Sequence, residues 1–118
     1  MKWYLAKLVY RIICGEGNHK PQFDEQLRLI HAEDDLYAFQ KARTTGHQEE
    51  DTFLNNAQKL VHWKFIDVPE LHPLNELTDS AELYSRICEE DDADNYIKIT
   101  YKRAAYLLEN STYQGVSF

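Results

Sequence analysis

The sequence predicts a single α+β domain, in which an antiparallel sheet of about five strands packs with two helices. Several segments alternate apolar and polar residues with the period of two that a strand requires, and two others show helical spacing. The length of 118 residues is typical of one domain with one core. We expect residues 1–109 to form this domain and residues 110–118 to form a loosely held tail.

The first expected strand runs from Trp3 to Cys14 and is apolar on both faces. One face suits the domain core and carries Tyr4, Ala6, Leu8, Tyr10 and Ile12. The other face carries Trp3, Leu5, Val9 and Ile13. Only Lys7 and Arg11 interrupt this second row, and a strand of this kind is normally covered on both sides. We therefore expect a homodimer interface that includes this second row or residues of the strand expected over 59–68.

The stretch ICGEGNHKPQF, residues 13–23, joins the first strand to a second one over residues 23–31. Gly15, Gly17 and Asn18 tolerate the positive φ angles that short hairpin connections need. A phosphate-binding loop would instead lead into a helix. The stretch is therefore interpreted as a turn.

A helix is expected over residues 32–45. Acidic residues at its start favour the positive end of the helix dipole, and Leu36, Phe39 and Ala42 form an apolar stripe at helical spacing. Gly46 is expected to end this helix.

Two further strands are expected over residues 51–55 and 59–68, joined by a turn at residues 56–58. Pro69 and Pro73 should end the second of them, because proline cannot donate a ladder hydrogen bond.

A turn at Asp79 and Ser80 should lead into a fifth strand over residues 82–88. The segment 93–108 is ambiguous, since YIKITYK alternates like a strand. Its acidic start and the four-residue spacing of Asp94 and Lys98 favour a helix, which is the interpretation adopted.

Four stretches, WYLAKLVYRI, YAFQKA, FLNNAQKLVHWKFIDVPELHPL and ELTDSAELYSRI, together resemble the small bacterial family DUF4288, a domain of unknown function. Its members begin with a similar WY-x-AK strand, carry an acidic stretch before a phenylalanine and include a W-x-F strand. The resemblance spans residues 3–88 and implies a glycine after Asp79, where this chain has Ser80. It implies no catalytic or binding residue, because none is known for the family.

The chain carries 13 Lys and Arg against 20 Asp and Glu, for a formal net charge of -7. Nucleic-acid binding depends on clustered cations, so a nucleic-acid partner is not expected. Basic residues interrupt the apolar N-terminal segment, and no stretch approaches about 18 apolar residues, so neither export nor a membrane partner is expected. We expect a cytoplasmic protein in which Cys14 and Cys88 stay reduced.

No histidine or cysteine falls into a metal-binding pattern such as CxxC or HExxH, and no serine lies in a nucleophile elbow. No catalytic residue, metal or cofactor is therefore predicted. The abundant aromatic residues suit interfaces as well as cores. The sequence favours a non-enzymatic binding or protein-interaction domain that forms a homodimer, with another protein as a further candidate partner.

The alternative is a small enzyme or ligand-binding protein. Trp63 and Tyr84 would line its pocket, and Glu49, Glu50 and Asp51 would supply carboxylates. Neighbouring carboxylates can raise one pKa and provide a general acid or base.

Overall fold

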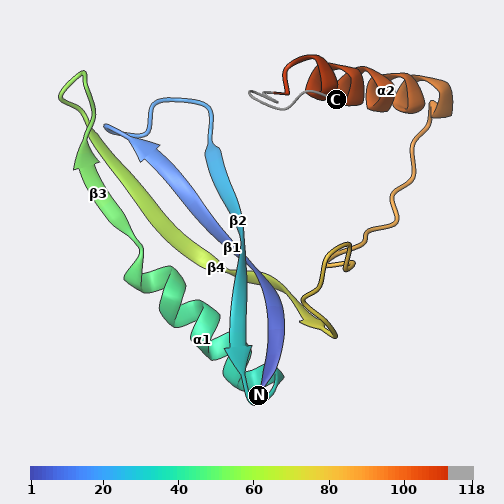
Figure 1. Ribbon diagram of the computed structural model, residues 1–118. Helices are drawn as coiled ribbons and strands as arrows, with labels where there is room; N and C mark the ends of the chain where they lie inside the picture. The colour runs from blue at the N-terminus through green and yellow to red at the C-terminus, as the bar shows by residue number, and fades with distance from the viewer. Residues whose placement is uncertain (112–118) are drawn as a thin grey trace. The chain divides into compact units, whose positions relative to one another are not determined.

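The structure is a computed structural model that describes residues 1–111. Its internal contacts divide the chain into two compact units, Met1–Ser85 and a second unit that begins at Arg86. The first unit holds four strands and one helix, and the second holds another helix (Figure 1). The predicted α+β fold with an antiparallel sheet and two helices is confirmed, with four strands in place of about five.

The sheet has the strand order β2-β1-β4-β3, and every neighbouring pair is antiparallel. Its members are β1 (Lys2–Cys14), β2 (Gln22–Ala32), β3 (Asp51–Leu54) and β4 (Leu60–Leu74). The register between β1 and β2 is unbroken from Lys2 opposite Ala32 to Ile12 opposite Gln22. The register between β1 and β4 shifts twice around Val9.

The stretch between β1 and β2 is a turn, as interpreted. Gly15 and Gly17 have φ angles of 58° and 81°, in the region that favours glycine. His19 has a local structural role that the sequence did not reveal, because its Nε2 accepts a hydrogen bond from the backbone N–H of Cys14 at 3.0 Å. Its Nδ1 lies 2.9 Å from the carbonyl oxygen of Lys20.

Helix α1 (Asp35–Gln48) begins three residues later than expected, because Asp34 is its N-cap and accepts a hydrogen bond from the N–H of Tyr37. The expectation that Gly46 ends the helix is wrong, since Gly46 lies inside it. A Cβ atom at Gly46 would stand 2.3 Å from Cε1 of Phe65. Glycine therefore allows the helix to approach the sheet closely at this position.

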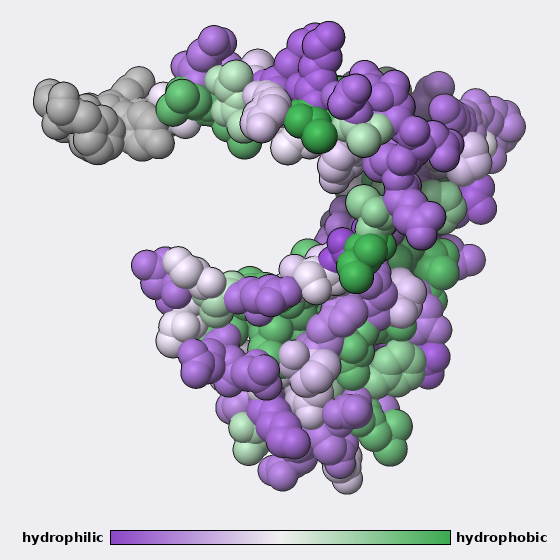
Figure 2. Space-filling view, turned by 90° about the vertical axis from the view of Figure 1, so that its right-hand side faces the viewer, coloured by the Kyte–Doolittle hydropathy of each residue, from purple (hydrophilic) through white to green (hydrophobic). Residues whose placement is uncertain are grey.

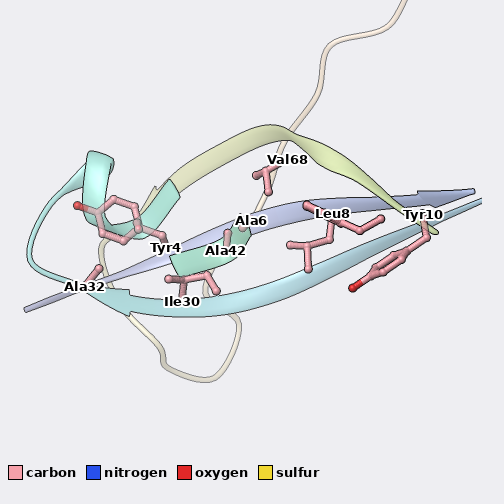
Figure 3. Close-up of a cluster of buried hydrophobic side chains, with 10 residues drawn as sticks. Tyr4, Ala6, Leu8, Tyr10, Ile30, Ala32, Ala42 and Val68 are labelled. Carbon is pink, nitrogen blue, oxygen red and sulfur yellow. The ribbon is translucent and has the colours of Figure 1, made fainter. Parts of the chain in front are cut away.

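The core lies between α1 and one face of the sheet, which we call the helix face (Figure 3). Four of the five residues of β1 expected in the core, Tyr4, Ala6, Leu8 and Tyr10, are buried and pack with Ala38 and Ala42 of α1, whereas the fifth, Ile12, is half-buried. Two tyrosine hydroxyls tie β1 to the helix: that of Tyr4 donates to Asp35, and that of Tyr10 donates to the carbonyl oxygen of Gly46. Since Tyr4 meets the start of α1 and Tyr10 meets its end, α1 runs parallel to β1.

Two expectations about the second half of the first unit are wrong. Strand β4 passes through Pro69 and Pro73 and ends at Leu74, because the Pro73 nitrogen faces away from β1 and Pro69 lies where the register shifts and pairs with no residue of β1. Residues 82–88 form no strand, although the turn before them is present: the N–H of Ala81 donates to the carbonyl oxygen of Thr78. With no N–H at either proline, this edge of β4 offers a fifth strand few hydrogen bonds.

The segment after residue 92 is a helix, α2 (Ala93–Glu109), which confirms that interpretation. Asp92 caps it by accepting a hydrogen bond from the N–H of Asn95 at 3.0 Å. None of its residues is buried, and hydrophobic side chains gather along one side of it at the top of the space-filling view (Figure 2). No helix in residues 1–111 is both long and apolar enough to cross a membrane. The expected loose tail, residues 110–118, falls mostly outside the described residues.

Candidate interaction edge

The backbone of β2 has one side bonded to β1 and one side free, and the hydrogen bonds show which residues face each way. In a strand, the N–H and C=O of one residue point to the same side, and successive residues alternate. The N–H of Gly15, directly after β1, donates to the carbonyl oxygen of Leu60, the first residue of β4, so odd-numbered residues of β1 face β4 and even-numbered ones face β2. Asp24 lies opposite Tyr10, so even-numbered residues of β2 bond to β1 and odd-numbered ones face outward.

The outward-facing backbone groups of β2 belong to Phe23, Glu25, Leu27, Leu29 and His31. The Lys41 ammonium donates to the carbonyl oxygen of His31 at 3.0 Å, which agrees with this direction and occupies that group. Pro21 precedes the strand at the other end. We call residues 23–29 the open edge: they contain no proline and no bulge, and no other strand of the described chain pairs with them.

The opposite side of the sheet is closed to strand pairing. Leu71 and Pro73 lie opposite Ala6 and Tyr4, whose backbones face β2, so their own groups point away from β1. Pro69 lies where the register between β1 and β4 shifts, and it has no partner in β1. Two of these three residues therefore lack an N–H. Beside them β3 is only 4 residues long and β4 has an irregular register, and short, bulged, proline-containing edges resist unwanted pairing.

Large apolar side chains accompany the open edge on the face opposite α1, which we call the outer face. Phe23, Leu27 and Leu29 are 55%, 54% and 51% exposed. Leu29 lies opposite Leu5 of the second row of β1, whereas Phe23 and Leu27 lie opposite Arg11 and Lys7, which interrupt that row. Trp3 of the second row stacks on His31 with ring centroids 4.2 Å apart. The open edge thus combines free backbone groups with exposed apolar side chains.

The four residues of β1 expected at an interface differ in exposure. Trp3 is 38% exposed, and Val9 and Ile13 are half-buried on the outer face. Leu5 is only 5% exposed, so it offers little surface to a partner. It lies opposite His72, against whose ring Tyr84 packs at 5.0 Å.

A polar row runs along β2 on the helix face. The side-chain amide of Gln26 donates to Asp24 at 2.6 Å, and Arg28 donates to the amide oxygen of Gln26 at 2.7 Å. Arg28 also makes a two-pronged ion pair with Glu49, with N···O distances of 2.8 and 2.9 Å. The hydrogen bonds from Arg28 lower the pKa of Glu49. The row thus has a guanidinium at Arg28 and a carboxyl group at Asp24, with Gln26 between them.

Four of the five proposed ligand-binding residues gather near the end of α1. Asp51 lies opposite Trp63 in the β3–β4 pair, and the indole N–H of Trp63 donates to Asp24 at 3.0 Å. Glu49 binds Arg28, as described. The carboxylate of Glu50 accepts a hydrogen bond from the backbone N–H of Phe65 at 2.7 Å. These carboxylates therefore make contacts within the chain that hold α1, β2 and β4 together.

The fifth residue, Tyr84, lies on the other side of the sheet. It packs on His72, within a group in which Glu70 accepts from Lys7 at 2.6 Å and lies 3.2 Å from Nε2 of His72. The hydrogen bond from Lys7, followed by that from His72, lowers the pKa of Glu70. Because the sheet separates Tyr84 from Trp63, the five residues do not line one pocket.

The residues that the structure describes contain no group of three or more His, Cys, Asp or Glu side chains placed to hold a metal ion. Cys14 and Cys88 are both free thiols, the first half-buried and the second exposed.

The open edge of β2 was missed from the sequence, which pointed to β1 instead. A signal was present, because Phe23, Leu27 and Leu29 share one face of an expected strand without proline. Its meaning depended on the strand order, since β1 is central and only β2 exposes a long edge.

Comparison with known families finds one match: the model of the family described as Domain of unknown function (DUF4288) covers residues 3–85. Neither the curated proteins nor the solved structures contain a match to this chain.

Proposed function

The chain belongs to the DUF4288 family, and we propose that it is a non-enzymatic protein-interaction domain that forms a homodimer through the open edge of β2. The observation that carries this proposal is the contrast between the two edges of the sheet. One has two prolines, an irregular register and a short final strand, whereas the other presents an unbroken strand. An exposed regular edge is a template for a strand of another chain.

The side chains at this edge favour association. Burying the exposed halves of Phe23, Leu27 and Leu29 would contribute about 1 kcal/mol each, roughly half of the value for a fully buried side chain. Trp3 extends the apolar surface on the neighbouring strand. The net charge of -7 opposes association weakly, because exposed charges more than about 8 Å apart are screened at physiological salt.

We place this function in the bacterial cytoplasm. The resemblance to a bacterial family and the two free thiols support this location, since thiols stay reduced in that compartment. A strand from another protein would use the same backbone groups, so a second protein is the alternative partner. A ligand pocket built from both Trp63 and Tyr84 is less well supported, because these side chains lie on opposite faces of the sheet.

Light scattering and sedimentation at micromolar concentrations test the homodimer. The expected mass is twice that of the chain, which is 13.9 kDa. Leu29→Lys should weaken the dimer by about tenfold or more, equivalent to about 1.4 kcal/mol, because it places a charge in the apolar part of the interface.

Leu36→Lys is the matched control, since Leu36 is a 62% exposed leucine on α1, away from the open edge. It should leave the dimer unchanged. A mass of 13.9 kDa at every concentration, or equal weakening by both variants, would contradict the proposal.

A further inference from the structure

Resting on the proposed homodimer, we infer that the two copies pair β2 with β2 in one antiparallel register, centred on Gln26, to form a continuous eight-stranded sheet. Three features of the chain converge on this register: the limits of the open edge, the charges of the polar row, and the positions of the apolar side chains.

The limits of the open edge select the centre of the pairing. Free outward-facing groups run from Phe23 to Leu29, because Lys41 occupies the carbonyl oxygen of His31 and Pro21 precedes the strand. The midpoint of this stretch is Gln26. A twofold axis there places Phe23 opposite Leu29 of the second copy and Glu25 opposite Leu27, so every free outward-facing residue has a free counterpart.

Neighbouring registers are less favourable. A centre at Leu27 places Phe23 opposite His31 of the second copy, whose carbonyl oxygen is already occupied. A centre at Glu25 places two glutamates directly opposite each other, and like charges in that position are destabilising. A twofold axis that passes between two residues would place a residue whose backbone faces outward opposite one whose backbone bonds to β1, and the hydrogen-bond ladder could not form.

The polar row is complementary to itself in the register centred on Gln26. Arg28 lies opposite Asp24 of the second copy, and this contact occurs twice by symmetry. Both residues belong to even positions, whose backbones bond to β1, so they form a non-hydrogen-bonded pair across the new interface. Opposite side chains come closest at such pairs. Gln26 faces Gln26, and each side-chain amide has one N–H beyond the one that it donates to Asp24 of its own chain.

On the outer face, the side chains of the two copies are also compatible in this register. Phe23 of each copy packs against Leu29 of the other, which covers an exposed apolar pair at each end of the pairing. At the inner positions, Glu25 faces Leu27 of the second copy and remains 3.7 Å from the Lys7 ammonium of its own chain. No like charges meet on this face.

Disulfide trapping tests the register. In a Cys14→Ser, Cys88→Ser background, Gln26→Cys places two thiols directly opposite each other at the symmetry axis, at a separation that suits a disulfide. We expect rapid and nearly complete formation of the covalent dimer under mild oxidation. Leu36→Cys on α1 and Gln22→Cys, which would lie opposite Ile30 of the second copy, are controls that should link only slowly.

A second measurement avoids the polar row, in case Gln26→Cys disturbs folding. Copies carrying Glu25→Cys are mixed with copies carrying Leu27→Cys, and the mixture should link faster than either variant alone. A dimer that shows neither this preference nor the Gln26 link overturns the register while the proposed function stands. A chain that stays monomeric throughout overturns both.

Discussion

Gly46→Ala tests how closely α1 packs on the sheet. The added Cβ atom would lie 2.3 Å from Cε1 and 2.5 Å from both Cδ1 and Cζ of Phe65. The ring has little room to retreat, because Phe65 is 5% exposed and meets Tyr10 on one side and His47 on another. The helix cannot rise freely either, since the Tyr10 hydroxyl binds the carbonyl oxygen of Gly46 at 3.0 Å.

Two effects of opposite sign set the magnitude. Overpacking a core costs about 1 to 3 kcal/mol, and three contacts this short favour the upper end. Replacing a helical glycine by alanine contributes about 1 kcal/mol in the other direction. We therefore expect Gly46→Ala to lower the free energy of unfolding by about 2 kcal/mol, which corresponds to a fall of roughly 10 °C in Tm for a unit of this size.

Urea unfolding followed by tryptophan fluorescence measures this change. The double variant Gly46→Ala, Phe65→Leu is the informative control, because the smaller side chain makes room for the methyl group. The two changes should then be non-additive, with a favourable coupling energy of about 1 kcal/mol. A Gly46→Ala chain as stable as its parent would show that the helix and sheet separate easily and would refute the close-packing interpretation.

Three further predictions concern single contacts. Ser80→Gly should raise the free energy of unfolding by about 0.5 to 1 kcal/mol, because Ser80 has a φ of 69° that glycine adopts without strain; an unchanged urea midpoint would count against it. Tyr10→Phe should lower the free energy of unfolding by about 1 kcal/mol, since the buried carbonyl oxygen of Gly46 loses its donor. A variant as stable as its parent would show that water replaces the tyrosine hydroxyl as the donor. The hydrogen bonds from Arg43 lower the pKa of Asp67 in the folded chain. The ion pair therefore stabilises the fold at pH values above the unfolded-state pKa of Asp67, and this stabilisation is lost as the pH falls below about 4. Arg43→Gln should therefore flatten the acid side of the stability curve, and an unchanged pH profile would contradict this.

The alternation of apolar residues was sufficient to predict the core side of the first strand and the presence of α1. The ends of elements depended on tertiary contacts that the sequence does not display. Gly46 is a common terminator of helices, yet here it continues α1 because Phe65 leaves no space for a side chain. Pro69 and Pro73 are common strand breakers, yet β4 continues through them because the Pro73 nitrogen faces away from β1 and Pro69 lies at a register shift, where no residue of β1 pairs with it.

The candidate site was less predictable than the fold, because it depends on the strand order. The sequence correctly showed surplus apolar residues on the second row of β1. It did not show that β1 is central in the sheet, or that Tyr84 packs on His72, which lies opposite Leu5. Likewise, the spacing of Trp63 and Tyr84 did not reveal that they project from opposite faces. Side-chain period fixes which residues share a face of one strand, whereas the assignment of faces between strands requires the pairing register.

The prolines of β4 also determine how many copies an edge-paired assembly can contain. A sheet that is open at both edges can add chains indefinitely, and the product is a fibre. In the proposed dimer, the pairing of β2 with β2 would use the open edge of both copies, and the edges left at the two ends would carry Pro69, Pro73 and the short β3. Growth would therefore stop at two copies, so the same residues that shape the strand would also protect the protein against polymerisation.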